Sequence, residues 1–228
     1  MEFEQLNSAQ CQTPPTPAVE LLLVDDHAVV RAGFTVLLSL SENVKVVAEA
    51  ERGEQAIKLY QDLKPDVVVM DISMPGIGGL EAIRRIVLRD PDAIILVYSV
   101  HHEQVYVQRA IDAGAKGYIT KNSAPELLLL AIEAIMQGQC YIEPGLSKTN
   151  GSPAELANPK AIIATFSPRE FDVFRLLAQG LTIQKIADHL CLGHKTIANY
   201  ATQVKKKLKV DTTAELAHIA VNLDLLIK

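Results

Sequence analysis

Short β-rich runs alternate with segments of helical periodicity over the first 140 residues, and this alternation leaves few folds open to the chain. The expected strands are residues 19–24, 44–50, 67–70, 94–98 and 118–119. The expected helices are residues 28–40, 53–63, 80–88, 105–113 and 125–136. Continuous apolar strands separated by helices predict a parallel sheet that is covered on both sides, which is a doubly wound α/β fold.

The pattern changes after residue 140. Residues 141–162 are rich in Pro, Gly, Ser and Asn, as in a linker, and helical patterns follow at residues 168–179, 182–190, 194–208 and 213–223. We therefore expect four parts, which are a disordered tail over residues 1–18, an α/β domain over 19–140, a linker over 141–162 and an all-α domain over 163–228. Residues 1–162 contain 13 Lys and Arg against 21 Asp and Glu, whereas residues 163–228 contain 9 against 6. The two halves thus carry opposite net charges and are expected to have different partners.

Five polar residues stand at the ends of the predicted strands. They are Asp25, Asp26, Asp71, Ser99 and Lys121. The carboxyl ends of parallel strands meet at one edge of a sheet, so these side chains are expected to line one pocket. Clustered carboxylates repel each other, and a hard cation such as Mg²⁺ together with the Lys121 ammonium would compensate them. Such a pocket suits a phosphoryl group, which Asp71 could accept as an aspartyl-phosphate.

The strings LLLVDDHAVVRAG, VVVMDISMPGIGGLEA, VYS and KGYITK resemble the motifs of two-component response-regulator receiver domains. The resemblance covers roughly residues 19–140 and implies a flavodoxin-like fold. It implies that Asp71 is the phosphoacceptor for a sensor histidine kinase. It further implies that Mg²⁺ is bound by Asp25, Asp26, Asp71 and the backbone carbonyl of Ser73, and that Ser99 and Lys121 contact the phosphoryl group.

The same resemblance implies a switch. Phosphorylation adds about 1.5 to 2 negative charges and three acceptor oxygens. Ser99 would be drawn toward these oxygens, and the aromatic switch residue Tyr118 would rotate into the space that Ser99 leaves. The face formed by the fourth helix, the fifth strand and the fifth helix would then change shape, and a homodimer is expected in the phosphorylated state.

The string FSPREFDVFRLLAQGLTIQKIADHLCLGHKTIANYATQVKKKLKV resembles the LuxR-type helix-turn-helix of the NarL/FixJ response regulators. Ser167, with Glu170 three residues later, predicts a capping box at the start of its first helix. The resemblance makes residues 194–208 the recognition helix. The spacing of Ile197, Ala201, Val204 and Leu208 predicts the face that this helix turns toward the core.

The opposite face of the recognition helix is expected to meet double-stranded promoter DNA. The candidate DNA-binding residues are Lys195, Thr196, Asn199, Gln203, Lys205, Lys206 and Lys207. We assign the lysines and Thr196 mainly to phosphates, and Asn199 to a base edge. Ala198 and His194 depart from the family pattern, which commonly has Lys or Asn at the first position and Ser at the second, and this leaves the sequence preference open.

The strings MDISMPGIGGLEA, AGAKGYITK and QGQCYI resemble the GacA/UvrY branch of the family. We therefore expect a bacterial transcription regulator rather than an enzyme. No apolar run approaches the roughly 20 residues that cross a bilayer, and the N-terminus lacks the features of a signal peptide, so a cytoplasmic protein without membrane contact is expected.

Two alternatives remain. The receiver domain could be a constitutive dimerisation module that needs no phosphorylation. A phosphatase of the haloacid dehalogenase type also uses a strand-end Asp and Mg²⁺, but that class needs a second Asp two residues after the nucleophile, where this chain has Ser73.

Overall fold

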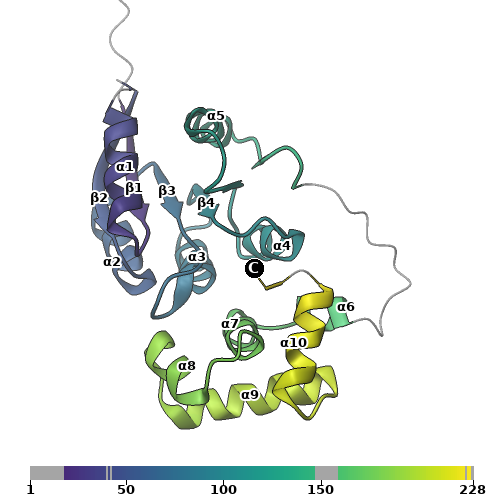
Figure 1. The fold of residues 1–228 in the computed structure, drawn as a ribbon. Helices are drawn as coiled ribbons and strands as arrows, with labels where there is room; N and C mark the ends of the chain where they lie inside the picture. The colour runs from purple at the N-terminus through teal and green to yellow at the C-terminus, as the bar shows by residue number, and fades with distance from the viewer. Residues whose placement is uncertain (1–17, 40, 42, 147–158, 224, 227–228) are drawn as a thin grey trace, which may run out of the picture.

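The computed structural model describes residues 18–39, 41, 43–146, 159–223 and 225–226 of the 228-residue chain (Figure 1). The predicted disordered tail lies almost wholly outside the described residues, as does most of the predicted linker. The strands are β1 (Val19–Val24), β2 (Val44–Ala50), β3 (Val67–Met70), β4 (Ile95–Ser99), β5 (Gly117–Thr120) and β6 (Tyr141–Ile142). The helices of the N-terminal half, which we define as residues 18–146, are α1 (Ala28–Ser39), α2 (Gly53–Leu63), α3 (Gly78–Arg89), α4 (Gln104–Asp112) and α5 (Pro125–Met136).

The strands form one parallel sheet in the order β2-β1-β3-β4-β5-β6. Successive strand residues point to opposite faces, so Leu21 and Leu23 pack with α1 and α5, while Leu22 and Val24 pack with α2, α3 and α4. This two-sided burial is the reason that the strands read as continuous apolar runs, and it confirms the predicted doubly wound α/β fold.

The C-terminal half, which we define as residues 159–226, is helical. Its helices are α6 (Pro159–Ala164), α7 (Pro168–Ala178), α8 (Ile183–Leu190), α9 (His194–Leu208) and α10 (Thr213–Asn222). The predicted capping box is present, since the Ser167 hydroxyl accepts from the Glu170 N–H and the Glu170 carboxylate accepts from the Ser167 N–H. The four helices α7 to α10 lie where the sequence predicts helices, whereas β6 opens the predicted linker of residues 141–162 and α6 begins inside it and continues to Ala164.

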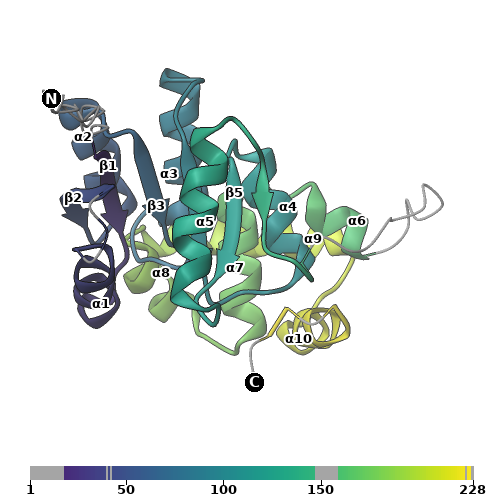
Figure 2. The same cartoon turned by 90° about the horizontal axis from the view of Figure 1, so that it is seen from above.

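The two halves pack against each other. In Figure 1, α7 lies between the α3–α4 side of the sheet half and α9, and Figure 2 shows α7, α8 and α9 beneath the sheet half. Buried residues of α3 and α4 form one continuous apolar cluster with buried residues of α6 and α7. No helix in the described part of the chain is both long enough and apolar enough to span a membrane.

Two glycines allow a matched test of the packing around β3. A Cβ on Gly79, in the first turn of α3, would overlap the carbonyl oxygen of Asp71, whereas a Cβ on Gly33 in α1 would meet nothing within 4 Å. We expect Gly79→Ala to lower the free energy of unfolding by about 1–3 kcal/mol, because backbone must move to admit the methyl group. Gly33→Ala should raise it by about 0.5–1 kcal/mol, because alanine favours the helix. Urea unfolding of both variants measures this, and a loss from Gly33→Ala equal to that from Gly79→Ala would contradict it.

Candidate functional site

Three predicted site residues meet at the carboxyl edge of the sheet. Asp25 follows β1, Asp71 follows β3 and Lys121 follows β5. The Lys121 Nζ lies 2.5 Å from Asp25 Oδ2 and 2.8 Å from Asp71 Oδ2. Both carboxylate side chains are only 2% exposed. One ammonium therefore holds two buried carboxylates that follow the neighbouring strands β1 and β3.

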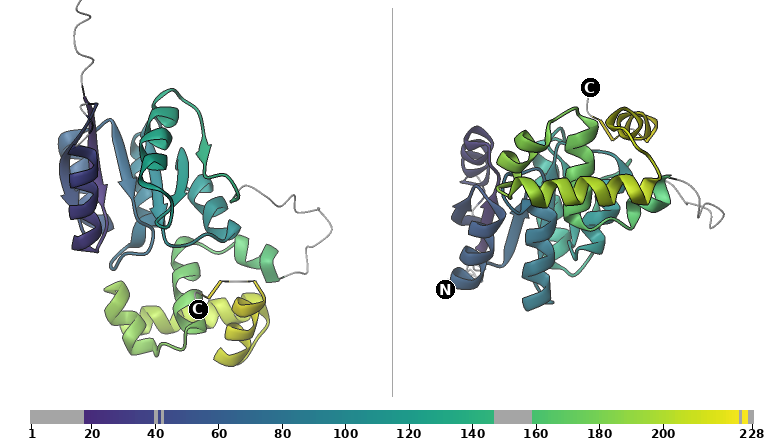
Figure 3. Two further views of the ribbon diagram at one scale, coloured as in Figure 1. Left: turned by 45° about the horizontal axis from the view of Figure 1, so that its top comes forward. Right: turned by 90° about the horizontal axis from the view of Figure 1, so that it is seen from below.

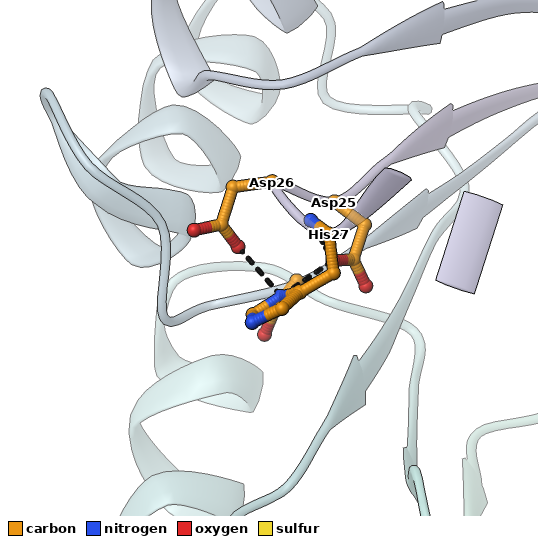
Figure 4. A group of neighbouring side chains, drawn as sticks. Asp25, Asp26 and His27 are labelled. Atoms are coloured by element: carbon orange, nitrogen blue, oxygen red, sulfur yellow. Dashed lines mark hydrogen bonds and ion pairs between the residues drawn. The ribbon is translucent and has the colours of Figure 1, made fainter. Parts of the chain in front are cut away.

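Asp26 and His27 complete the acidic group (Figure 4). The His27 Nδ1 lies 3.1 Å from Asp25 Oδ1 and 3.0 Å from Asp26 Oδ1. The carbonyl of His27 also accepts hydrogen bonds from the N–H groups of Val30 and Arg31. His27 thus stands immediately before α1 and turns its ring toward the carboxylates.

The chemistry of this group fits a divalent cation. One ligand atom each from Asp25, Asp26, His27 and Asp71 lies within 4.8 Å of the others. Asp26 Oδ1 is buried and faces His27 Nδ1 at 3.0 Å, a contact that is not a well-formed hydrogen bond. Carboxylate oxygens are the ligands of hard cations, and a buried oxygen that lacks a well-formed hydrogen bond is one that a cation would satisfy.

The charges in the pocket do not balance without a further cation. Burial raises the pKa of Asp71, and Lys121 offsets that rise only in part. Burial alone would lower the pKa of Lys121, but Asp71 and Asp25 raise it above its usual value, so the ammonium stays charged. One positive group therefore faces three carboxylates.

The loop between β4 and α4 connects the pocket to its surroundings. The Ser99 Oγ accepts from the N–H of His101 at 3.2 Å, and the Tyr118 hydroxyl donates to the carbonyl of His101 at 2.8 Å. The resemblance implies that Tyr118 rotates into the space that Ser99 leaves on phosphorylation, and the Tyr118 ring is fully buried here. In this structure the tyrosine already lies inside and anchors the backbone of the loop.

The side chains of His101 and Ser73 are in contact, which no pattern in the sequence predicts. The Ser73 N–H donates to Asp71 Oδ1 at 3.1 Å, while its Oγ lies 2.8 Å from the Nε2 of His101. The ring of His101 stacks on Tyr106 at 3.9 Å between centroids. Burial lowers the pKa of His101 to about 3, so the ring is neutral. The position of His101 two residues after Ser99 was the only sequence signal for this link.

The helix α9 has the two faces that its sequence predicts. Its buried residues are Ile197, Ala201, Val204 and Leu208. The side chains of Lys195, Thr196, Asn199, Gln203 and Lys206 are exposed. The N-cap is Gly193, which offers no side chain to cap the helix, and His194 is the first helical residue.

Two of the candidate phosphate-binding lysines already have partners within the C-terminal half. The Lys207 Nζ lies 2.7 Å from the Glu170 carboxylate and 5.5 Å from the centre of the Phe166 ring. The Lys205 Nζ donates to the carbonyl of Asp211 at 3.0 Å. These contacts direct both ammonium groups to partners within their own helical bundle. Lys195 and Lys206 are the lysines of α9 whose exposed side chains are available to a ligand.

The raised pKa of Asp71 predicts a pH-dependent effect of Asp71→Asn on stability. A carboxyl group whose pKa is higher in the folded state destabilises the fold as the pH rises through that pKa, by about 1.4 kcal/mol for each unit of the difference. Asparagine cannot ionise, so the variant does not lose this stability as the pH rises. We expect the variant to be more stable than the wild type at pH 8 in urea unfolding without Mg²⁺, and the gain to shrink as the pH falls. A gain that is the same at every pH would contradict the assignment of a raised pKa.

Comparison with known families agrees with this geometry. A family model described as "Response regulator receiver domain" matches residues 21–133. A second, described as "Bacterial regulatory proteins, luxR family", matches residues 164–220. The first match contains the acidic pocket, and the second contains α9.

Relatives match both halves together. Response regulator GacA of Pseudomonas aeruginosa is 38% identical over 207 residues, which is 89% of this chain and 95% of the relative. Response regulator UvrY of Escherichia coli is 37% identical over 204 residues, 89% of this chain and 94% of the relative. A structure of the RcsB response regulator of Salmonella typhimurium, at 26% identity, covers 91% of this chain and 99% of its own with a TM-score of 0.68. The chain belongs to the family of response regulators that join a receiver domain to a LuxR-type DNA-binding domain.

Proposed function

We propose that this response regulator is a transcription factor gated by phosphorylation at Asp71. The observation that carries the proposal is the buried Lys121 ammonium between the carboxylates of Asp25 and Asp71, at the carboxyl edge of the sheet. The domain division follows the sequence analysis, with a tail over residues 1–18, the receiver over 19–140, a linker over 141–162 and the DNA-binding domain over 163–228.

In the proposed reaction, an Asp71 carboxylate oxygen attacks the phosphorus of a phosphohistidine on a sensor kinase. The O–P bond forms as the N–P bond to the histidine breaks, and the histidine leaves with the bonding electron pair. Asp25, Asp26, Asp71 and the Ser73 carbonyl would hold Mg²⁺, which supplies positive charge for the phosphoryl oxygens. Lys121 gives further compensation, and the Ser99 hydroxyl donates to a phosphoryl oxygen.

The switch that we propose works through the β4–α4 loop. When Ser99 Oγ moves toward the phosphoryl group, it gives up the hydrogen bond that it accepts from His101 N–H. The Tyr118 hydroxyl donates to the carbonyl of His101, so a shift of His101 would move the acceptor of that hydrogen bond. Because Tyr118 is already buried, we expect the loop to move rather than the ring to rotate inward.

The partners follow from the two domains. A related RcsB structure, with a TM-score of 0.60 and 25% identity, has promoter DNA bound in the presence of the phosphomimetic BeF3⁻. For this chain we propose a sensor histidine kinase, double-stranded promoter DNA and a second copy of the chain after phosphorylation. The proposed location is the cytoplasm, where the kinase domain and the promoter are both accessible.

Incubation with acetyl phosphate and Mg²⁺ followed by intact-mass measurement tests the acceptor. We expect the mass of one phosphoryl group on the wild type, none on Asp71→Asn, and one on Asp62→Asn, which removes an exposed carboxylate outside the pocket. Labelling of Asp71→Asn at the wild-type level would overturn the assignment.

The same phosphorylated sample distinguishes the proposed switch from a constitutive dimerisation module and from a phosphatase. Sedimentation should show a larger dimer fraction after phosphorylation, whereas a constitutive dimerisation module would give one state with and without the phosphoryl donor. Continuous release of phosphate from a general monoester such as p-nitrophenyl phosphate would favour the phosphatase.

The salt dependence of DNA binding tests the lysine on the outer face of α9. Lys206 is exposed there, and each phosphate that a lysine neutralises adds about 0.9 to the slope of log K against log salt on duplex DNA. We expect Lys206→Ala to weaken binding to a mixed-sequence duplex and to reduce that slope by about one. Lys45→Ala, which removes the same charge from an exposed position on β2, should leave both unchanged. Equal losses from the two variants would show that net charge, and not a contact by α9, determines the binding.

A further inference from the structure

A ring nitrogen of His27 lies among the carboxylate oxygens of the receiver pocket. Its Nδ1 is 3.1 Å from Asp25 Oδ1 and 3.0 Å from Asp26 Oδ1. One ligand atom from each of these three residues and from Asp71 lies within 4.8 Å of the others. The pocket therefore contains, beside its oxygen ligands, a possible ligand of a different chemical class, an imidazole nitrogen.

A hydrogen bond accounts for only half of this arrangement. The Nδ1 of an imidazole carries at most one proton, so it can donate to one oxygen but not well to two. The contact with Asp25 Oδ1 has the geometry of a hydrogen bond. The contact with Asp26 Oδ1 does not, and this buried oxygen is left without a well-formed hydrogen bond. A cation among the three atoms would bind both oxygens and the nitrogen together.

The separations between these atoms are those of ligands around one cation. With bonds of about 2.1 Å in an octahedral site, adjacent ligand atoms lie about 3.0 Å apart and opposite ones about 4.2 Å apart. The distances of 3.1 and 3.0 Å from the His27 Nδ1 match the shorter value. The limit of 4.8 Å on the whole group is close to the longer one. Small movements would therefore bring these atoms onto one ion.

The corner between β1 and α1 holds His27 in this position. The His27 N–H donates to Asp25 Oδ1 at 2.8 Å, and the His27 carbonyl accepts from the N–H groups of Val30 and Arg31. The buried Arg31 guanidinium donates to the carbonyl of Asp25 at 2.7 Å. Contacts of this kind orient metal ligands before the metal binds.

Lys121 leaves the His27 side of Asp25 open to a cation. Its ammonium bonds Oδ2 of Asp25 and Oδ2 of Asp71, so Oδ1 is the oxygen of Asp25 that faces the imidazole. The side chain of His27 is 64% exposed, which gives a hydrated ion a path to the ring from solvent.

A nitrogen ligand changes which cations a site prefers. Mg²⁺ takes oxygen ligands and gives up its waters reluctantly. Imidazole suits transition-series ions, and the affinity of sites that contain nitrogen rises from Mn²⁺ through Fe²⁺ and Co²⁺ to Ni²⁺. Three carboxylates alone would suit Mg²⁺, whereas the same carboxylates with His27 suit an ion that accepts both oxygen and nitrogen.

We propose that His27 is a metal ligand of the receiver pocket, and that its Nδ1 makes the pocket bind a transition-series divalent cation more tightly than Mg²⁺. The proposal rests on the function proposed above, because it uses the same carboxylates and the same place beside Asp71. Acceptance of a phosphoryl group by Asp71 would then be supported by such a cation at a lower concentration than by Mg²⁺.

Calorimetric titration of the full chain with CoCl₂ and with MgCl₂ tests the selectivity. We expect the wild type to bind Co²⁺ at least about tenfold more tightly than Mg²⁺, and His27→Gln to lose about tenfold in Co²⁺ affinity but less than about twofold in Mg²⁺ affinity. A residue that only shapes the pocket would change both affinities by the same factor. Equal losses for the two metals, or no preference for Co²⁺ in the wild type, would overturn the proposal.

His189 of α8 provides the matched control, since it is another imidazole near the same carboxylate. Burial and Arg175 lower the pKa of His189, against a smaller opposing effect of Asp26. Figure 3 shows α8 below the α1 side of the sheet half in the left view and beside α1 in the right view. His189→Gln should leave both metal affinities unchanged. A selective loss of Co²⁺ affinity in His189→Gln but not in His27→Gln would assign the nitrogen to α8 and overturn the role of His27.

Proton NMR of the Co²⁺-loaded chain detects the bond itself. The ring protons of a histidine bound to paramagnetic Co²⁺ resonate far outside the ordinary range. We expect such signals in the wild type and in His189→Gln but not in His27→Gln. Wild type grown with ring-deuterated histidine should also lack them, which gives a readout that does not depend on the folding of a variant. Their absence from Co²⁺-loaded wild type would overturn the proposal.

Intact mass after incubation with acetyl phosphate and saturating Mg²⁺ keeps this proposal separate from that of the phosphoacceptor. Both the wild type and His27→Gln should gain one phosphoryl group, because Asp71 is the proposed acceptor in each. A wild type that gains the group but shows no preference for Co²⁺ would overturn the role of His27 and leave Asp71 as the acceptor. A wild type that binds Co²⁺ through His27 but gains no mass would overturn the proposed function and leave the metal ligand.

Discussion

The Lys121 ammonium between Asp25 and Asp71 is the interaction around which the receiver pocket is built. It joins residues that follow β1, β3 and β5, so it connects the ends of the neighbouring strands β1 and β3 to the end of β5, which lies two places beyond β3 in the sheet. It also leaves the pocket short of positive charge, since Asp26 adds a third carboxylate, whose buried Oδ1 has the His27 ring nitrogen beside it but no well-formed hydrogen bond in the described residues. A site with this deficit is suited to a cation, and a cation bound there would relieve the repulsion among the carboxylates and compensate the charge of a phosphoryl group.

Neutral side chains connect this pocket to the loop between β4 and α4. Ser99, Ser73 and Tyr118 all bond to His101, through its N–H, its ring and its carbonyl respectively. Burial keeps the ring of His101 neutral and the hydroxyl of Tyr118 protonated, so neither group competes with Lys121 for the charge of the pocket. The hydrogen bonds of this loop depend on where acceptors lie. The three phosphoryl oxygens of the proposed phosphorylated state would offer new acceptors beside it.

Local patterns in the sequence were enough to predict most of the helices and strands and the residues of the acidic pocket. Parallel strands force their carboxyl ends together, and the positions of Asp25, Asp71 and Lys121 follow from that rule alone. The two-residue strand β6 and the six-residue helix α6 were missed, because segments so short carry no periodicity and lie among turn residues. Contacts between the two domains could not be predicted from the sequence for a different reason. Nothing local in the sequence indicates that Arg109 will bond the carbonyls of Ile163 and Phe166, since these contacts depend on how two folded domains fit together.

The same limit applies to α9, where helical periodicity identifies a polar face but not the partner of each side chain. Lys207 belongs to that face by sequence, yet its ammonium lies beside Glu170, a residue of the capping box of α7. The lysine thereby stabilises the N-terminus of the helix that also rests on the receiver through Phe171. One helix, α7, therefore meets the core of the DNA-binding domain on one side and the receiver on the other. Because α7 packs on α9 and α10 as well as on the receiver, the residues that hold the two halves together also belong to the core of the DNA-binding domain.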